Sequence, residues 1–218
     1  MDITYLGQSS FKIKAKNTTL VTDPFDPGVV GIKYPKLSEI DIVTVSHAHS
    51  DHNHLANIKD PRMVLQEPGE YEIGGVSIRG IGSFHDDKKG ELRGSNTIFV
   101  FEADGLRFAH FGDLGHKLGE GVIEELGTID VLMLPVGGFY TVDAQVAAEI
   151  VRSIEPAITI PMHYQVKGLS SDIHDKLTPV DDFLKILGMS VENLEKLSVK
   201  KMDISETESK VVVLEIKA

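Results

Sequence analysis

The sequence of 218 residues contains no cysteine. The protein therefore cannot form a disulfide, use a thiolate nucleophile, or bind an iron–sulfur cluster or a zinc finger's zinc through sulfur. Long apolar stretches are also missing, because runs such as Val131 to Leu134 are far too short to cross a bilayer. The first residues show no basic stretch followed by an apolar run, so we expect no signal peptide. We expect a cytoplasmic protein without a membrane partner.

Basic residues are also fewer than acidic ones. The chain has 22 Lys and Arg against 33 Asp and Glu, a formal net charge of −11. A broad nucleic-acid surface requires an excess of basic residues, so the balance argues against a nucleic-acid partner. The length, together with the lack of a linker or an internal repeat, predicts one domain over residues 1–218. A homo-oligomer remains compatible with these numbers.

Short apolar runs separated by turn residues predict many strands in the first half, at 3–6, 11–15, 18–22, 42–45, 63–66, 76–81, 97–102 and 106–111. Asp104-Gly105 between the last two predicts a hairpin. The second half alternates, with strands expected at 131–134, 157–160, 194–199 and 211–216 and helices at 121–126, 142–154 and 178–187. This order predicts an α/β (α+β) fold, a four-layer αββα sandwich of two mixed β-sheets with helices on both outer faces.

Four of the nine histidines lie within residues 46–54, directly after a predicted buried strand. His47 and His49 are two apart, so in an extended segment they share a face. Asp51 and His52 are adjacent and cannot join that face without a turn. The spacing therefore suits two neighbouring metal positions, and imidazole with carboxylate suits zinc, iron or manganese. The alternative is a solvated turn that happens to be rich in histidine, which this density of ligand side chains disfavours.

The segment from His47 to His52 resembles the HxHxDH motif of the metallo-β-lactamase superfamily. Further landmarks of that family follow in its order, namely Asp23 after an early strand, His85 in Ser83-Phe84-His85-Asp86, Asp113 after Gly112, and His163 in Ile160-Pro161-Met162-His163. The opening residues 3–11 are similar to those of small metal-dependent hydrolases related to ascorbate-6-phosphate lactonase. These relatives often carry histidine where this sequence has Gln8.

The resemblance implies a binuclear metal site and hydrolysis by a hydroxide that bridges the two ions. It implies that the first ion is held by His47, His49 and His85, the second by Asp51, His52 and His163, with Asp113 bridging both. The ions would be two divalent metals, zinc first, with manganese or iron(II) as alternatives. Asp51 and Asp113 would be the catalytic residues, and either Asp51 or water on the second metal would protonate the leaving group.

The expected reaction is cleavage of a small ester, lactone or phosphodiester, and the lactonase-like opening favours a phosphorylated or carboxylated small molecule. Two other classes remain open. One is a nuclease of the same fold, which the acidic charge and the lack of an inserted basic arm disfavour. The other is a non-catalytic metal-binding module, although all seven ligand candidates are present.

Several residues outside the ligand set have more than one interpretation. Asp23 is either a turn residue or, as we favour, an acceptor that orients a ligand histidine. Arg93 binds a substrate phosphate or carboxylate or is a solvated loop charge. Gly137-Gly138 indicates a close backbone approach or a plain turn. The roles of the other candidates stay open: a cap or outer contact for His54, a core or outer contact for His110, a substrate contact for His116, a solvated His174, and pocket walls for Tyr140 and Tyr164.

Overall fold

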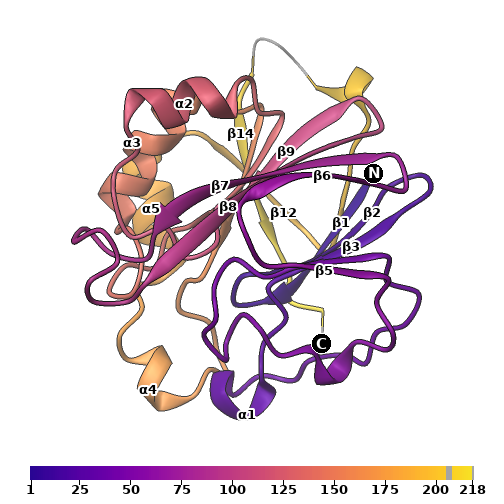
Figure 1. Ribbon diagram of the computed structural model, residues 1–218. Coiled ribbons are helices and arrows are strands. Elements are labelled where there is room, and N and C mark those ends of the chain that lie inside the picture. The colour runs from indigo at the N-terminus through magenta and orange to yellow at the C-terminus, as the bar shows by residue number, and fades with distance from the viewer. Residues whose placement is uncertain (205–207, 218) are drawn as a thin grey trace.

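Two β-sheets form the centre of the computed structural model, which describes residues 1–204 and 208–217 (Figure 1). The six-stranded sheet has the order β13 (Leu197–Ser198), β1 (Asp2–Gly7), β2 (Ser10–Lys14), β3 (Thr19–Thr22), β4 (Ile42–Thr44), β5 (Met63–Leu65). The eight-stranded sheet has the order β12 (Ser190–Leu194), β14 (Lys210–Leu214), β11 (Ile158–Met162), β10 (Val131–Pro135), β9 (Leu106–His110), β8 (Ser95–Ala103), β7 (Val76–Phe84), β6 (Gly69–Ile73). Both contain parallel and antiparallel pairs, which confirms the predicted fold of two mixed sheets.

The main core lies between the two sheets. Alternate residues of β1 and β2, such as Ile3 and Phe11, point to this core because successive strand side chains face opposite ways. From the other sheet, Phe101 and Phe108 stack with ring centroids 4.9 Å apart. These side chains are fully buried, and removing their apolar surface from water is the main force that holds the sheets together.

Helices α2 (Glu120–Leu126), α3 (Ala144–Ile154) and α5 (Val180–Leu187) cover the outer face of the eight-stranded sheet (Figure 1). The cover over the six-stranded sheet is thinner and includes the one-turn 3-10 helix η1 (Leu55–Asn57). The remaining elements are the short helices α1 (Pro27–Val30), α4 (Ser171–His174) and η2 (Lys201–Asp203). Within residues 1–204 and 208–217, none of the helices has the length and apolar character needed to span a bilayer.

Local sequence explains where several elements begin and end. Asp143 caps α3 by accepting a hydrogen bond from the Val146 backbone N–H at 2.8 Å. Gly188 ends α5 with a φ of 71°, a conformation that costs glycine little. Asp104 and Gly105 have φ values of 54° and 77° and form the predicted hairpin between β8 and β9.

Two differences from the expected strands have a physical reason. The expected strand over 194–199 spans two elements, because the chain turns at Glu195-Lys196 and passes from β12 in one sheet to β13 in the other. The edge strand β6 was missed, although Glu70-Tyr71-Glu72-Ile73 alternates exposed and half-buried residues as an edge strand does, because this run is only four residues long. It is held by pairing with β7.

Candidate metal centre

The predicted ligands come together where parallel strands end. Strands β3 and β4 run in the same direction in one sheet, and β9 and β11 in the other. Ligands commonly bind beyond the carboxyl ends of such strands, because the following loops meet there. The loop after β4 supplies His47, His49, Asp51 and His52, and the segments after β7, β9 and β11 supply His85, Asp113 and His163.

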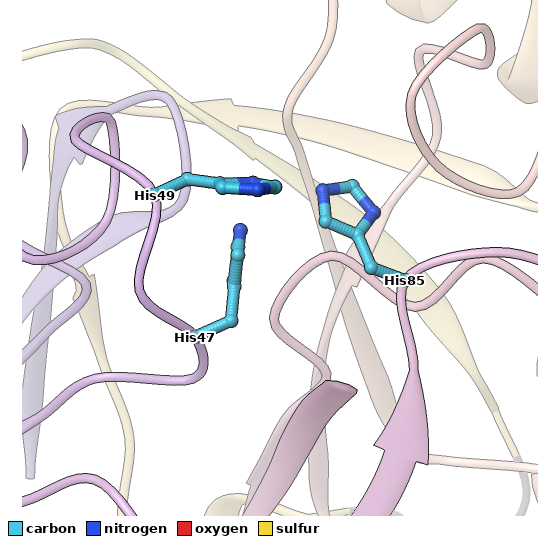
Figure 2. A group of neighbouring side chains, drawn as sticks. All are labelled: His47, His49 and His85. Atoms are coloured by element: carbon cyan, nitrogen blue, oxygen red, sulfur yellow. The ribbon is translucent and has the colours of Figure 1, made fainter. Parts of the chain in front are cut away.

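Three histidines form the first group. Atoms of His47, His49 and His85 that could ligate a metal lie within 4.8 Å of one another. Figure 2 shows the three imidazole rings converging, with His47 and His49 on one loop and His85 beyond the end of β7. The extended loop lets two histidines two residues apart reach one point, as the spacing predicts.

A second group adjoins the first and contains Asp51, His52, Asp113 and His163, whose ligand atoms also lie within 4.8 Å of one another. Asp113 is its centre. Its Oδ2 lies 3.2 Å from Nε2 of both His52 and His163. The same oxygen lies 3.3 Å from Nε2 of His85, which belongs to the first group. One carboxylate oxygen therefore contacts histidines of both groups.

Asp23 fixes the proton on His52. Its Oδ2 lies 2.8 Å from His52 Nδ1, and because an ionised carboxylate can only accept, Nδ1 carries the hydrogen. The other ring nitrogen of His52, Nε2, then faces the carboxylates of Asp51 and Asp113. Asp23 therefore orients a ligand candidate, as we favoured from the sequence.

Ser46 does the same for His47. The Ser46 hydroxyl donates its one hydrogen to Asp23, so the contact of 3.0 Å between Ser46 Oγ and His47 Nδ1 must be donated by the histidine. The lone pair of His47 is then on Nε2, a buried atom without a hydrogen-bond partner. Asp23 thus orders two ligand candidates, one directly and one through Ser46.

The electrostatics of the group favour a bound cation. Burial acts to raise the pKa of Asp113, but the neighbouring His163 and His52 hold it well below its usual value. Burial acts to lower the pKa of His52, but the carboxylates of Asp113 and Asp51 hold it well above its usual value. Burial and then the charge of His52 lower the pKa of His47 to about 3. Asp113 is thus ionised and His47 neutral, the forms in which these side chains ligate metals, whereas His52 carries a proton that a metal ion would displace.

The donor set fits a divalent metal. Buried polar atoms in proteins are almost always hydrogen-bonded, yet four ring nitrogens are buried here without a partner within the described chain, on His47, His52, His85 and His163. The unpartnered atom is Nε2 on His47 and His52 but Nδ1 on His85 and His163, whose Nε2 lies beside Asp113. The imidazole nitrogens and carboxylate oxygens of the two groups together form the nitrogen and oxygen set that zinc, manganese and iron accept.

Gln8 belongs to the same site, which the sequence indicated only as a departure from relatives with histidine. Its Nε2 donates to Asp51 Oδ2 at 3.1 Å. Its backbone carbonyl accepts from the backbone N–H of His163 at 2.9 Å. Gln8, Asp23 and His163 have φ values of 53°, 40° and 52°, in the left-handed region that non-glycine residues rarely adopt. Such strain concentrates at functional sites, where the surrounding structure compensates its cost.

Two residues that the sequence reading missed hold Asp113. Its backbone N–H donates to Asn96 Oδ1 at 3.0 Å, and Ser9 Oγ donates to its Oδ1 at 3.3 Å. Both Asn96 and Ser9 are buried polar residues at strand ends. A short polar residue between apolar strand residues was the available signal, but it is common in turns and therefore weak.

The other histidines lie outside the ligand groups. His110 is a satisfied core residue, with Nε2 at 2.7 Å from the Ser9 carbonyl and Nδ1 accepting from the Gly112 N–H at 3.2 Å. His54 precedes η1 and lies 3.7 Å from Asp26, and His174 is at the surface beside Asp175. The open substrate role of His116 finds no support, because both its nitrogens contact backbone atoms of Phe84 and Lys117.

A pocket of about 280 Å³ opens onto the two groups. Its walls are Gln8, Val29, His49, Asp51, His85, Arg93, Asp113, Tyr140 and Ile173. Tyr140 and Arg93 therefore line the pocket, whereas Tyr164 is buried beside Tyr5 in the core. The close approach expected at Gly137 exists, but to the backbone of His163 and Tyr164.

Comparison with known proteins agrees with this geometry. Residues 2–163 match the family model of the β-lactamase superfamily domain. The chain belongs to the metallo-β-lactamase superfamily. Within it, the chain belongs to the UPF0173 metal-dependent hydrolases. A member from Thermoplasma acidophilum is 32% identical over 196 residues, covering 78% of this chain and 85% of the relative.

Two further relatives cover nearly the whole chain. A UPF0173 metal-dependent hydrolase of Pyrococcus abyssi is 28% identical over 214 residues, covering 85% of this chain and 94% of the relative. A crystal structure from Thermotoga maritima, described as a zinc-dependent hydrolase of the metallo-β-lactamase superfamily, is 38% identical with a TM-score of 0.79 and covers 98% of both chains. This similarity extends to the C-terminal residues that the family model leaves unmatched.

Proposed function

We propose that this protein hydrolyses a small ester, lactone or phosphodiester with two divalent metal ions. The observation that carries the proposal is the contact of Asp113 Oδ2 with three histidines from both ligand groups, at 3.2 to 3.3 Å. The zinc-dependent description of the Thermotoga maritima relative makes zinc the first choice of metal. The resemblance of residues 3–11 to lactonase relatives keeps a lactone among the candidate substrates.

In this proposal the ligand groups keep the assignments of the sequence: His47, His49 and His85 for one ion, Asp51, His52 and His163 for the other, and Asp113 for both. When bound, such ions lower the pKa of a water to near neutrality and polarise the substrate carbonyl or phosphoryl oxygen.

Hydrogen bonds from neighbouring residues fix the orientation of the ligand candidates. Asp23 accepts the His52 Nδ1 hydrogen, and Ser46 accepts the His47 Nδ1 hydrogen, so each ring turns its Nε2 toward the site. Gln8 donates to one oxygen of Asp51 and so fixes that carboxylate. The charge of His52 helps to hold the pKa of Asp51 below its usual value against the effect of burial, which favours a ligand role for Asp51 over a role as proton donor.

The alternatives make different predictions. A nuclease would bind RNA or DNA with an affinity that falls steeply with salt. A non-catalytic metal-binding module would hold metal but turn over none of the substrate classes. The acidic balance of 33 against 22 charges disfavours the first, and the open pocket onto the ligand groups disfavours the second.

Metal analysis followed by a substrate screen tests the proposal. Protein purified without chelator should contain about two zinc, manganese or iron ions per chain, as expected for a two-metal site. It should hydrolyse at least one of a 4-nitrophenyl ester, a lactone and bis(4-nitrophenyl) phosphate, and EDTA should abolish that activity. Fewer than about one ion per chain, or turnover that survives complete chelation, would contradict the two-metal proposal.

A further inference from the structure

The loop after His85 places an arginine in the wall of the pocket. This loop is organised around Asp86, whose carboxylate accepts backbone hydrogen bonds from Lys88, Gly90, Leu92 and Arg93 at 2.8 to 2.9 Å. Desolvation acts to raise the pKa of Asp86, but these four donors lower it to about 2, so the acceptor stays ionised. The backbone of Arg93 is therefore fixed and does not belong to a freely moving loop.

Most N–H donors of the Arg93 guanidinium make no hydrogen bond within the described residues. Its only hydrogen bond within the described residues goes from Nη2 to the Phe139 carbonyl at 3.2 Å, and its Cζ lies 5.9 Å from the Tyr140 ring centroid. No carboxylate lies within ion-pair distance of it in residues 1–204 and 208–217, although acidic residues outnumber basic ones. By contrast, three other arginines each pair with a carboxylate, namely Arg62, Arg79 and Arg107.

The rest of the pocket shows where such donors could act. Tyr140 packs edge-on against His163, with ring centroids 6.3 Å apart, so the tyrosine ring is a neighbour of both the arginine and a ligand candidate. Val29 and Ile173 make an apolar wall, and Arg93 is the only lysine or arginine among the residues that line the pocket. A volume of about 280 Å³ admits a small molecule only.

We infer that Arg93 binds an oxyanion of the substrate that is separate from the scissile bond. The substrate is then a small ester, lactone or phosphodiester that carries a carboxylate or phosphate group, with a short apolar part against Val29 and Ile173. A guanidinium suits this role because its fork of N–H donors matches both oxyanions. The inference rests on the proposed hydrolytic function for the position of the scissile bond, but the oxyanion contact is testable without turnover.

The binding test uses metal-loaded protein and two probes, glutarate for a carboxylate and inorganic phosphate for a phosphate. Isothermal titration compares wild type with Arg93→Gln, Arg93→Lys and the control Arg62→Gln, all at equal metal content. Arg93→Gln should lower the binding affinity for at least one of the two anions by about tenfold to a hundredfold, which is the contribution expected of a pair of charge-assisted hydrogen bonds. Arg93→Lys should bind that anion more weakly than wild type but more tightly than Arg93→Gln. The control Arg62→Gln, at an exposed position, should change the affinity for the anion by less than about twofold.

The kinetic test uses a matched pair of substrates, the 4-nitrophenyl monoester of glutaric acid and 4-nitrophenyl pentanoate, which differ in the terminal carboxylate. Arg93→Gln should lower kcat/KM for the anionic ester, mainly through KM, by about tenfold to a hundredfold and leave the neutral ester nearly unchanged.

The outcomes separate this inference from the proposed function. Unchanged binding of both anions in Arg93→Gln, or no binding of either by wild type, overturns the oxyanion role even if the enzyme is active. Binding that depends on Arg93 without turnover of any substrate supports the oxyanion site and contradicts the hydrolytic proposal instead.

Discussion

Asp23 Oδ2 lies 2.8 Å from His52 Nδ1, and both side chains are fully buried. Asp23 lies outside the two ligand groups of the bridging arrangement but determines which nitrogen of His52 faces Asp113. The same carboxylate accepts from the backbone N–H and the hydroxyl of Ser46, next to His47. A residue outside the ligand groups therefore sets the geometry of the candidate metal centre.

Replacing Asp23 with alanine should weaken metal binding without removing any ligand. Partners that orient ligand histidines contribute about 10–100-fold to metal affinity. We expect a loss of that size for Asp23→Ala in competition with a chromophoric zinc chelator, and no change for the exposed Asp175→Ala. An unchanged zinc affinity in Asp23→Ala would show that His52 keeps its orientation without this partner.

Asp113→Ala should lose metal and activity together, because Asp113 Oδ2 contacts histidines of both groups. Elemental analysis of purified protein gives the metal content per chain, and the substrate found in the screen gives the turnover. Asp87→Ala, at an exposed position, is the matched control. Full metal content together with turnover in Asp113→Ala would eliminate the bridging role.

Without metal, stability should pass through a maximum near pH 6.5. The folded pKa of His47 is about 3 against an unfolded value near 6.5, so the unfolded chain binds the extra proton between these values and stability rises with pH. The contribution of His52 to stability depends on pH with the opposite sign. Its folded pKa is raised, so its contribution is complete below the unfolded pKa and is lost as pH rises through the folded one.

Urea unfolding of chelator-treated protein between pH 4 and 9 measures this profile. His47→Gln should reduce the rise on the acid side by up to about 1.4 kcal/mol per pH unit, the effect of one proton. His174→Gln, at the surface, should leave it unchanged. If the free energy of unfolding rises equally steeply with pH below the maximum in wild type and in His47→Gln, the lowered pKa of His47 is refuted.

Gly137→Ala should disturb His163, because a Cβ at this position would overlap the His163 carbonyl oxygen and lie 2.8 Å from Tyr164 Cα. Overpacking of this kind costs about 1–3 kcal/mol of unfolding free energy. We expect this loss together with reduced zinc content, because His163 is a ligand candidate. The control is Gly121→Ala in α2, which has open space around it and should gain about 0.5–1 kcal/mol. Equal stability of the two variants would show that the backbone yields.

Much of this architecture was readable from local sequence. The Asp104-Gly105 hairpin follows from two residues that accept positive φ, and Asp143 marks the start of α3. The division between β12 and β13 was not readable, because pairing with strands of two different sheets decides it and local pattern does not.

The site divides in the same way. Its ligand candidates could be selected from the sequence because a metal centre of this kind needs histidine and carboxylate at fixed spacings. Gln8, Ser9 and Asn96 were not identified as site residues, because each contributes one hydrogen bond to a partner far away in the chain, and nothing in a short polar segment indicates that partner.

The sequence by itself determined which side chains are available for chemistry. With no cysteine, the ligand candidates offer nitrogen and oxygen only, and the segment from His47 to His52 supplies four of them. The tertiary structure alone decided how they meet, because ligands from separate strands share a site only after both sheets have closed on one core. It also decided the charge of each group, since burial and neighbouring charges set the pKa values, and it placed Arg93 in the wall of the pocket that the ligand candidates share.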